Sequence, residues 1–308
     1  MRARLLLFPV AAALLGLAAC DLEDLGGFQK YQKDFHFSYP LKAGGSVSVE
    51  SFNGSVEVSG WEQDVVDIAG VKYGPTAEAA DSLQIDVSNS PQAVSIRAVR
   101  PSDRRSNQGA RFTIRIPRTA TLDRISTSNA AIRTVDGAGP AKLRTSNGLI
   151  RVQDLKGSLD AQTSNGAVEL IDVAGDAVVH SSNGRIRADN LRGSLDASTS
   201  NGSIQANIAQ SGRPVRLDTS NGSVDLTLPP NYSNDLGVST SNASITLRLP
   251  GQPNAHVIAH AGDSSITCDF EIKSMGVLDK NRLDGTLGAG GPLFDLGTSN
   301  GSIRLLKM

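Results

Sequence analysis

Residues Thr199-Ser200-Asn201-Gly202-Ser203 form a short polar motif that returns along most of the chain. Its asparagines lie 18 residues apart over five strict copies, then 20 and 21 residues apart over the next two. Self-similarity at a fixed period of this kind is typical of a solenoid, in which each repeat stacks on the next. The repeated asparagines are Asn129, Asn147, Asn165, Asn183, Asn201, Asn221, Asn242 and Asn300, with an outlying early copy at Asn53.

Apolar and polar residues alternate on both sides of each motif, which is the period of a β-strand. The alternation runs through Ile150-Arg151-Val152 after one motif and through Leu159, Ala161 and Thr163 before the next. No helical period appears between them, which excludes repeat folds that contain helices. The sequence therefore predicts an all-β fold, a right-handed parallel β-helix (solenoid) with coils of about 18 residues and a β-rich N-terminal cap. A second bend is expected at Gly139, Gly157, Gly175 and Gly193.

The motif itself is expected to form the corner between two strands, because asparagine and glycine tolerate positive φ. In stacked coils the asparagine amides would lie one above another and bond to each other, satisfying polar groups that the bend turns inward. The threonine would stack in the same way. We interpret the motif as a scaffold, because a ligand site rarely needs so many copies.

The first twenty residues are typical of a secretion signal, with Arg2 and Arg4 ahead of an apolar run that ends at Leu17. Leu17-Ala18-Ala19-Cys20 resembles the bacterial lipoprotein processing box, which implies a lipid on Cys20 and attachment to a membrane. Asp21 resembles the signal that keeps some lipoproteins in the inner membrane. The implied location is the cell envelope, facing the periplasm or the outside. The alternative is an ordinary signal peptide with a chance cysteine.

The signal, and the point at which the strict repeat begins, divide the chain into four parts. We expect a removed signal at 1–19, a lipidated cysteine and tether at 20–40, a β-rich N-terminal part at 41–122, and repeat coils with a C-terminal cap at 123–308. Within the N-terminal part, Thr76 is expected to cap a short helix at 77–82. The part is expected to begin the coils with a hairpin-like elaboration, or to cover the first edge with a small β cap.

Charge and cysteine content exclude several classes of protein. The 30 basic and 31 acidic residues leave almost no net charge, so nothing favours a nucleic-acid partner. With Cys20 lipidated, Cys268 has no disulfide partner and is expected to be a small buried hydrophobe. His256 and His260 share a strand face but would lie too far apart to hold one metal. We expect no metal and no cofactor.

The T-S-N-G-x-I coil, the opening Gly45-Ser46-Val47-Ser48-Val49 and the ending that begins at Leu283 are similar to a bacterial family of exported β-strand-repeat proteins. The family is catalogued as putative adhesins and as a domain of unknown function. The resemblance covers residues 38–308. It implies a β-helix exported to the envelope and carries over no catalytic residues.

Parallel β-helices also include polysaccharide lyases and hydrolases, which need clustered carboxylates in a groove. No two acids fall in adjacent coils of the main outward row, and Arg151, Glu169 and Arg187 are expected to form a salt-bridge ladder instead. We therefore expect no enzyme, with a polysaccharide-acting enzyme of the envelope as the alternative. The outward row is Arg133, Arg151, Glu169, Arg187, Gln205, Asp225 and Thr246.

Two loops interrupt the repeat in its longer coils, at 229–234 and 250–254, and both fall on one side. Such loops are candidate binding sites for an envelope protein or a surface glycan. Tolerated insertions without function are the alternative. The candidate binding residues are Asn231, Tyr232, Asn234, Gln252 and Asn254.

Overall fold

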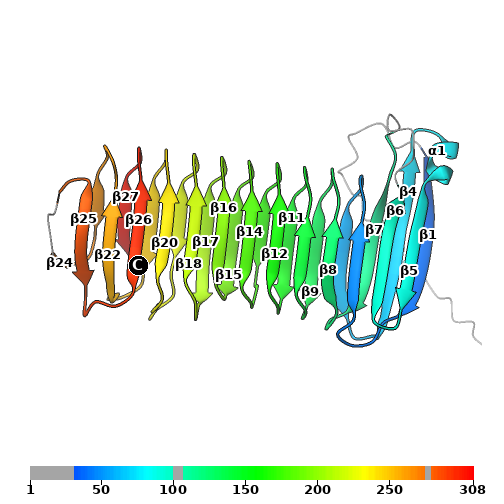
Figure 1. Cartoon of the computed structure of the whole chain (residues 1–308), viewed down its shortest axis with the longest axis horizontal. Helices are drawn as coiled ribbons and strands as arrows, with labels where there is room; N and C mark the ends of the chain where they lie inside the picture. The colour runs from blue at the N-terminus through cyan, green and yellow to red at the C-terminus, as the bar shows by residue number, and fades with distance from the viewer. Residues whose placement is uncertain (1–30, 100–106, 275–278) are drawn as a thin grey trace, which may run out of the picture.

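The structure is a computed structural model that describes residues 31–99, 107–274 and 279–308, so the candidate lipidation site Cys20 lies outside the described residues. The fold is all-β and solenoid-like, with two long sheets that run the length of the molecule (Figure 1). Each repeat coil contributes one strand to each sheet, and neighbouring repeat strands are parallel. Among the described residues, no helix is long and apolar enough to cross a membrane.

We call the two sheets A and B. In spatial order, sheet A contains β1 (Tyr31–Pro40), β4 (Val65–Gly74), β7 (Gly109–Pro117), β3 (Val56–Trp61), β9 (Ile132–Gly137), β11 (Ile150–Leu155), β13 (Val168–Ile171), β15 (Ile186–Arg192), β17 (Ile204–Gln210), β19 (Val224–Thr227), β21 (Ile245–Leu249), β27 (Ile303–Lys307) and β23 (Ile266–Cys268). Sheet B contains β24 (Ile272–Ser274), β25 (Arg282–Leu287), β22 (Ala255–His260), β26 (Leu293–Thr298), β20 (Leu236–Thr240), β18 (Val215–Thr219), β16 (Leu195–Thr199), β14 (Ala177–Ser181), β12 (Leu159–Thr163), β10 (Ala141–Arg144), β8 (Thr121–Ser126), β2 (Ser46–Glu50), β6 (Ala93–Val99) and β5 (Gln84–Ser90).

The central coils follow the register that the repeat predicts. Ile150 pairs with Val168, and Val168 pairs with Ile186, each partner 18 residues further along the chain. Alternate residues of every central strand point inward and are buried, so the two sheets close on one continuous apolar core. The strands expected on either side of the motif are confirmed.

The corner at the motif is built differently from the expectation. None of the repeated asparagines has positive φ, so that part of the prediction is wrong. A Cβ on Gly166 would lie 1.7 Å from the carbonyl oxygen of Gly148, one coil away, so glycine is needed for the close approach of the two turns. Positive φ occurs instead just before the second bend, at Asp136, Asp154, Asp172 and Asn190.

The threonine of the motif, and not the asparagine, is the polar residue that points inward. Thr163 is buried, accepts the N–H of Gly166 at 3.2 Å and donates to the carbonyl of Gly148 at 3.2 Å. The same pair of contacts recurs at Ser181 and Thr199. Each hydroxyl thus closes its own turn and ties it to the preceding coil.

The asparagines form a hydrogen-bonded ladder on the exposed edge of the solenoid, which corrects the expectation that they satisfy inward-facing groups. From Asn129 onward, each side-chain NH₂ donates to the side-chain oxygen of the asparagine one coil before, at 2.6 to 2.8 Å, and the Asn53 NH₂ donates to the backbone carbonyl of Gln108 at 3.1 Å. The ladder runs in spatial order through Asn53, Asn129, Asn147, Asn165, Asn183, Asn201, Asn221, Asn242 and Asn300.

The N-terminal end of the solenoid is elaborated by antiparallel strands (Figure 1). Residues 31–40 were expected to belong to a tether but form β1, because Phe35, Phe37 and Tyr39 turn toward the core while all ten residues pair with β4. The helix α1 (Ala77–Ser82) is confirmed, with the Thr76 hydroxyl accepting the N–H of Ala79 at 3.1 Å.

Near each end of the solenoid, one coil is inserted out of sequence order between two others. The first coil, β2 and β3, lies between the coil of β6 and β7 and the coil of β8 and β9. The last coil, β26 and β27, lies between the coil of β20 and β21 and the coil of β22 and β23. Spatial order therefore departs from sequence order at both ends, and the carboxyl terminus lies within the array (Figure 1).

Candidate binding groove

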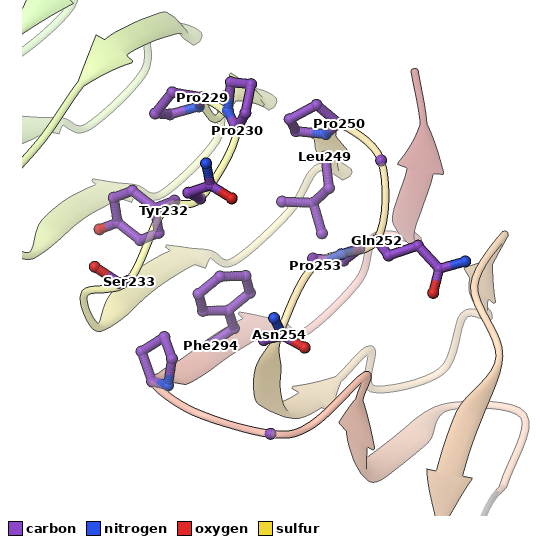
Figure 2. A pocket seen from close by; sticks show the side chains of 14 residues that line it. Pro229, Pro230, Tyr232, Ser233, Leu249, Pro250, Gln252, Pro253, Asn254 and Phe294 are labelled. Atoms are coloured by element: carbon purple, nitrogen blue, oxygen red, sulfur yellow. The ribbon is translucent and has the colours of Figure 1, made fainter.

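The two loops that interrupt the repeat meet at one cavity near the C-terminal end of the solenoid (Figure 2). Its volume is about 550 Å³, which falls in the range of small-ligand and side-chain binding pockets. We call it the groove. It is lined by Pro229, Pro230, Asn231, Tyr232, Ser233, Leu249, Pro250, Gly251, Gln252, Pro253, Asn254, Gly290, Pro292 and Phe294.

The inserted C-terminal coil creates the groove. The loop at 228–235 leads into β20 and the loop at 250–254 leads into β22, but β26 lies between these two strands. The loops are therefore two coils apart, about 10 Å, and not one. The short turn at 288–292, which contains three glycines, lies between them and leads into β26. Two bulky loops on either side of a small turn leave a hollow.

The floor of the groove is rigid and apolar. Tyr232 is only 9% exposed and Phe294 only 1%, and their ring centroids lie 5.9 Å apart. The Tyr232 hydroxyl donates to the backbone carbonyl of Asp235 at 2.9 Å, which fixes the loop against its own end. Burial raises the pKa of Tyr232 to about 12, so its phenol is neutral at physiological pH. Leu249 completes the floor and is buried as well.

The rim consists of prolines and amide side chains. Five prolines line the groove, and each fixes its own φ, which limits the conformations of both loops. Asn254 accepts the N–H of Ala289 at 2.8 Å and so links its loop to the inserted turn. Within the described part of the chain, the side chains of Asn231 and Gln252 make no hydrogen bond. Both are exposed, and Figure 2 shows the Gln252 side chain directed away from the other labelled residues of the groove.

Four of the five candidate binding residues line the groove: Asn231, Tyr232, Gln252 and Asn254. Asn234 does not, because its side chain donates to the backbone carbonyl of Ser211 at 3.1 Å. The structure also adds Gly290, Pro292 and Phe294 from the inserted coil. Nothing in the sequence marks them as neighbours of the loops, because the pattern does not reveal the insertion.

In the part of the chain that the structure describes, the outward rows hold ion pairs and no cluster of carboxylates. Arg133 lies 3.3 Å from Glu57, and Arg151 lies 3.4 Å from Glu169. Arg187 pairs with Asp189 on its own strand at 2.7 Å, so the expected ladder does not continue beyond Glu169. Among the described residues, no group of three or more histidines, cysteines and acids is placed to hold a metal ion.

The sequence did not predict one charged cluster. It lies on the outer face of sheet A near the N-terminal end of the solenoid. Asp67 is only 8% exposed and accepts hydrogen bonds from Arg115 at 2.7 Å and from His36 at 2.7 Å. Arg115 also lies over the ring of Trp61, 4.4 Å from its centroid. The hydrogen bond from Arg115 holds the pKa of the Asp67 carboxyl below its ordinary value. The cluster ties β1, β4, β7 and β3 together.

The sequence matches the model of one known protein family. Residues 71–274, more than half of the chain, match the family model described as Toastrack DUF4097. The chain belongs to the Toastrack DUF4097 family. No curated protein matches the sequence. The Toastrack match covers the central coils and both loops of the groove, and it ends before the inserted coil.

Two solved structures are similar to this Toastrack protein. One is a putative adhesin from Bacteroides fragilis NCTC 9343, with 16% identity and a TM-score of 0.42 over 91% of this chain and 100% of that chain. The other is a putative cell adhesion protein from Clostridium sporogenes ATCC 15579, with 11% identity and a TM-score of 0.25 over 90% of this chain and 100% of that chain.

Proposed function

We propose that this protein is a non-catalytic binding module of the cell envelope and that a partner binds in the groove. The observation that carries the proposal is the convergence of the two interrupting loops on one preformed cavity. Loops on a rigid scaffold are where binding residues concentrate. The groove offers exposed amides and no acid, base or nucleophile in a catalytic arrangement, which supports binding and not chemistry.

The proposal includes an anchor. The resemblance of Leu17-Ala18-Ala19-Cys20 to the lipoprotein box supports a lipid on Cys20, with the solenoid projecting from the membrane surface. The elaborated end of the solenoid follows the anchor in the chain, and the strands β20, β22 and β26, which adjoin the groove, lie near the opposite end (Figure 1). A right-handed sense of the coils belongs to the same proposal, because parallel crossover connections strongly favour that hand.

The test is site-specific photo-cross-linking in intact cells. A photoreactive amino acid replaces Gln252 at the rim of the groove, and a matched variant carries it at Gln205, an exposed position on the flat face of sheet A. We expect a discrete cross-linked product from position 252 and none from position 205. Equal products from both positions, or a product from position 205 alone, would place the partner on the flat face and refute the groove as the site.

A further inference from the structure

The charge of the groove narrows the class of its ligand. None of the lining residues is charged, although a fifth of the residues in the whole chain are. A charged ligand placed there would lose its hydration without an opposite charge to compensate it. The depletion of charge, together with apolar walls, is instead the composition of the core of a protein–protein interface.

The aromatic rings of the groove are not available as a stacking surface. Tyr232 and Phe294 lie beneath the loops and are nearly fully buried, so no aromatic face is presented to a sugar ring. The accessible apolar surface comes from proline instead. Pro230 is exposed, and Pro229, Pro250, Pro253 and Pro292 are partly exposed. This arrangement disfavours a neutral glycan.

Proline rings present C–H groups, and the face of an aromatic ring is electron-rich, so the two surfaces attract each other. The familiar arrangement for recognising proline-rich peptides has aromatic residues on the protein and proline on the ligand. Here the prolines are on the protein, so the complementary group on the ligand is an aromatic side chain. Aromatic anchors that fill a pocket supply much of the affinity of protein interfaces.

The side-chain amides that make no hydrogen bond in the described structure indicate that the ligand has a hydrogen-bonding backbone. Asn231 and Gln252 stand on opposite loops, and each side chain can both donate and accept a hydrogen bond. The Gln252 side chain points outward in Figure 2, and because it is exposed and makes no hydrogen bond with the described residues, it is free to rotate toward the groove. The backbone of an extended peptide crossing the groove offers the matching N–H and carbonyl groups. Because the prolines hold the loops rigid, little conformational entropy is lost when the peptide binds.

We propose that the groove binds an uncharged, extended peptide segment of a protein partner and holds an aromatic side chain of that segment against its prolines. The inference rests on the proposed function, because it specifies the ligand of the same groove.

The test uses nuclear magnetic resonance of the side-chain amides of Asn231 and Gln252 in the purified protein. The probes are N-acetyl-tryptophanamide, a neutral aromatic amide, and diacetylchitobiose, a neutral sugar. We expect the aromatic amide to shift both signals with a midpoint in the millimolar range and the sugar to leave them unchanged. Replacing Pro250 and Pro253 by alanine should weaken the aromatic amide at least fivefold. Replacing Pro214 by alanine, in an exposed loop outside the groove, should not.

Shifts caused by the sugar and not by the aromatic amide would overturn the peptide inference and leave the groove as the binding site. Shifts caused by neither probe would also overturn the peptide inference. The two failures are separable from failure of the proposed function, because the cross-link from position 252 reports on any partner in the groove, whatever its chemistry.

Discussion

Asn300 donates its side-chain amide to Asn242 at 2.8 Å, although 58 residues separate them in the sequence. The bond places the last motif directly beside the motif of Asn242. Residues 255–268 come earlier in the chain than the last motif, but they lie on its far side. The C-terminal coil is thus a wedge between two earlier coils. The same wedge separates the two loops and gives the groove its width.

Removal of residues 289–308 should open this end of the solenoid and leave the middle intact. In stacked repeats each coil is stabilised mainly by its nearest neighbours, so loss of the wedge removes the support of β22 and β25. Hydrogen exchange measured on backbone amides should show protection lost over 255–260 and retained over 159–199. Loss of protection along the whole solenoid would show that the coils fold as one cooperative unit.

Replacement of Asn183 by alanine should weaken the fold modestly. The side chain donates to Asn165 at 2.7 Å and accepts from Asn201 at 2.6 Å, and both bonds are lost. We expect the free energy of unfolding in urea to fall by about 1 to 2 kcal/mol. The control is alanine at Asn207, an exposed asparagine without a side-chain hydrogen bond in the described part of the chain. An equal loss in both variants would mean that the ladder adds nothing.

Replacement of Gly166 by alanine should be far more damaging. The new methyl group would lie 1.7 Å from the carbonyl oxygen of Gly148, so two coils must separate. We expect a loss of about 3 kcal/mol or more in the same urea experiment. Alanine at Gly212, which would meet no atom within 4 Å, should change stability by less than about 1 kcal/mol. Similar effects at the two sites would contradict the close-approach explanation.

Replacement of Asp67 by asparagine should change how stability depends on pH. Because Arg115 lowers the pKa of this carboxyl in the folded state, its stabilisation is present above the unfolded pKa of about 3.9 and is lost as the pH falls through the lower folded pKa. We expect the variant to be less stable by about 1 to 2 kcal/mol at pH 7 and to approach the wild type in acid. Melting curves across this pH range measure the difference. Asparagine at Asp196, an exposed residue, should leave the profile unchanged.

Much of the scaffold could be predicted from the sequence, because stacking imposes one period on every coil. The position of Asn147 fixes that of Asn165, and the alternation after each motif fixes which side chains point inward. The conformation of the corner could not be predicted from residue preference alone. Glycine is required at position 166 because the backbone of the neighbouring coil lies too close for a side chain. Positive φ occurs at Asp154 instead, and the only hint of this in the sequence was that Asp136, Asp154 and Asp172 are spaced 18 residues apart.

The groove could be predicted only in part. Broken periodicity marked the loops that contain Asn231 and Gln252. It could not show that Phe294 lies between them. A repeat strand has the same pattern wherever it stands in the sheet, so the pattern does not reveal which two strands are its neighbours. The charged cluster at Asp67 was missed for a similar reason. Its members come from antiparallel strands whose pairing no sequence spacing reveals.

Partner binding in the groove is tested most directly by filling the groove and measuring how much partner is recovered after cross-linking. Ser233 is exposed and lines the groove (Figure 2), so tryptophan in its place should block the cavity without disturbing the core. The control is tryptophan at Ser223, an exposed residue on the opposite edge. We expect at least a tenfold loss of recovered partner for S233W and none for S223W. Undiminished recovery with S233W, in a variant with an unchanged melting temperature, would contradict the claim that the groove is the binding site.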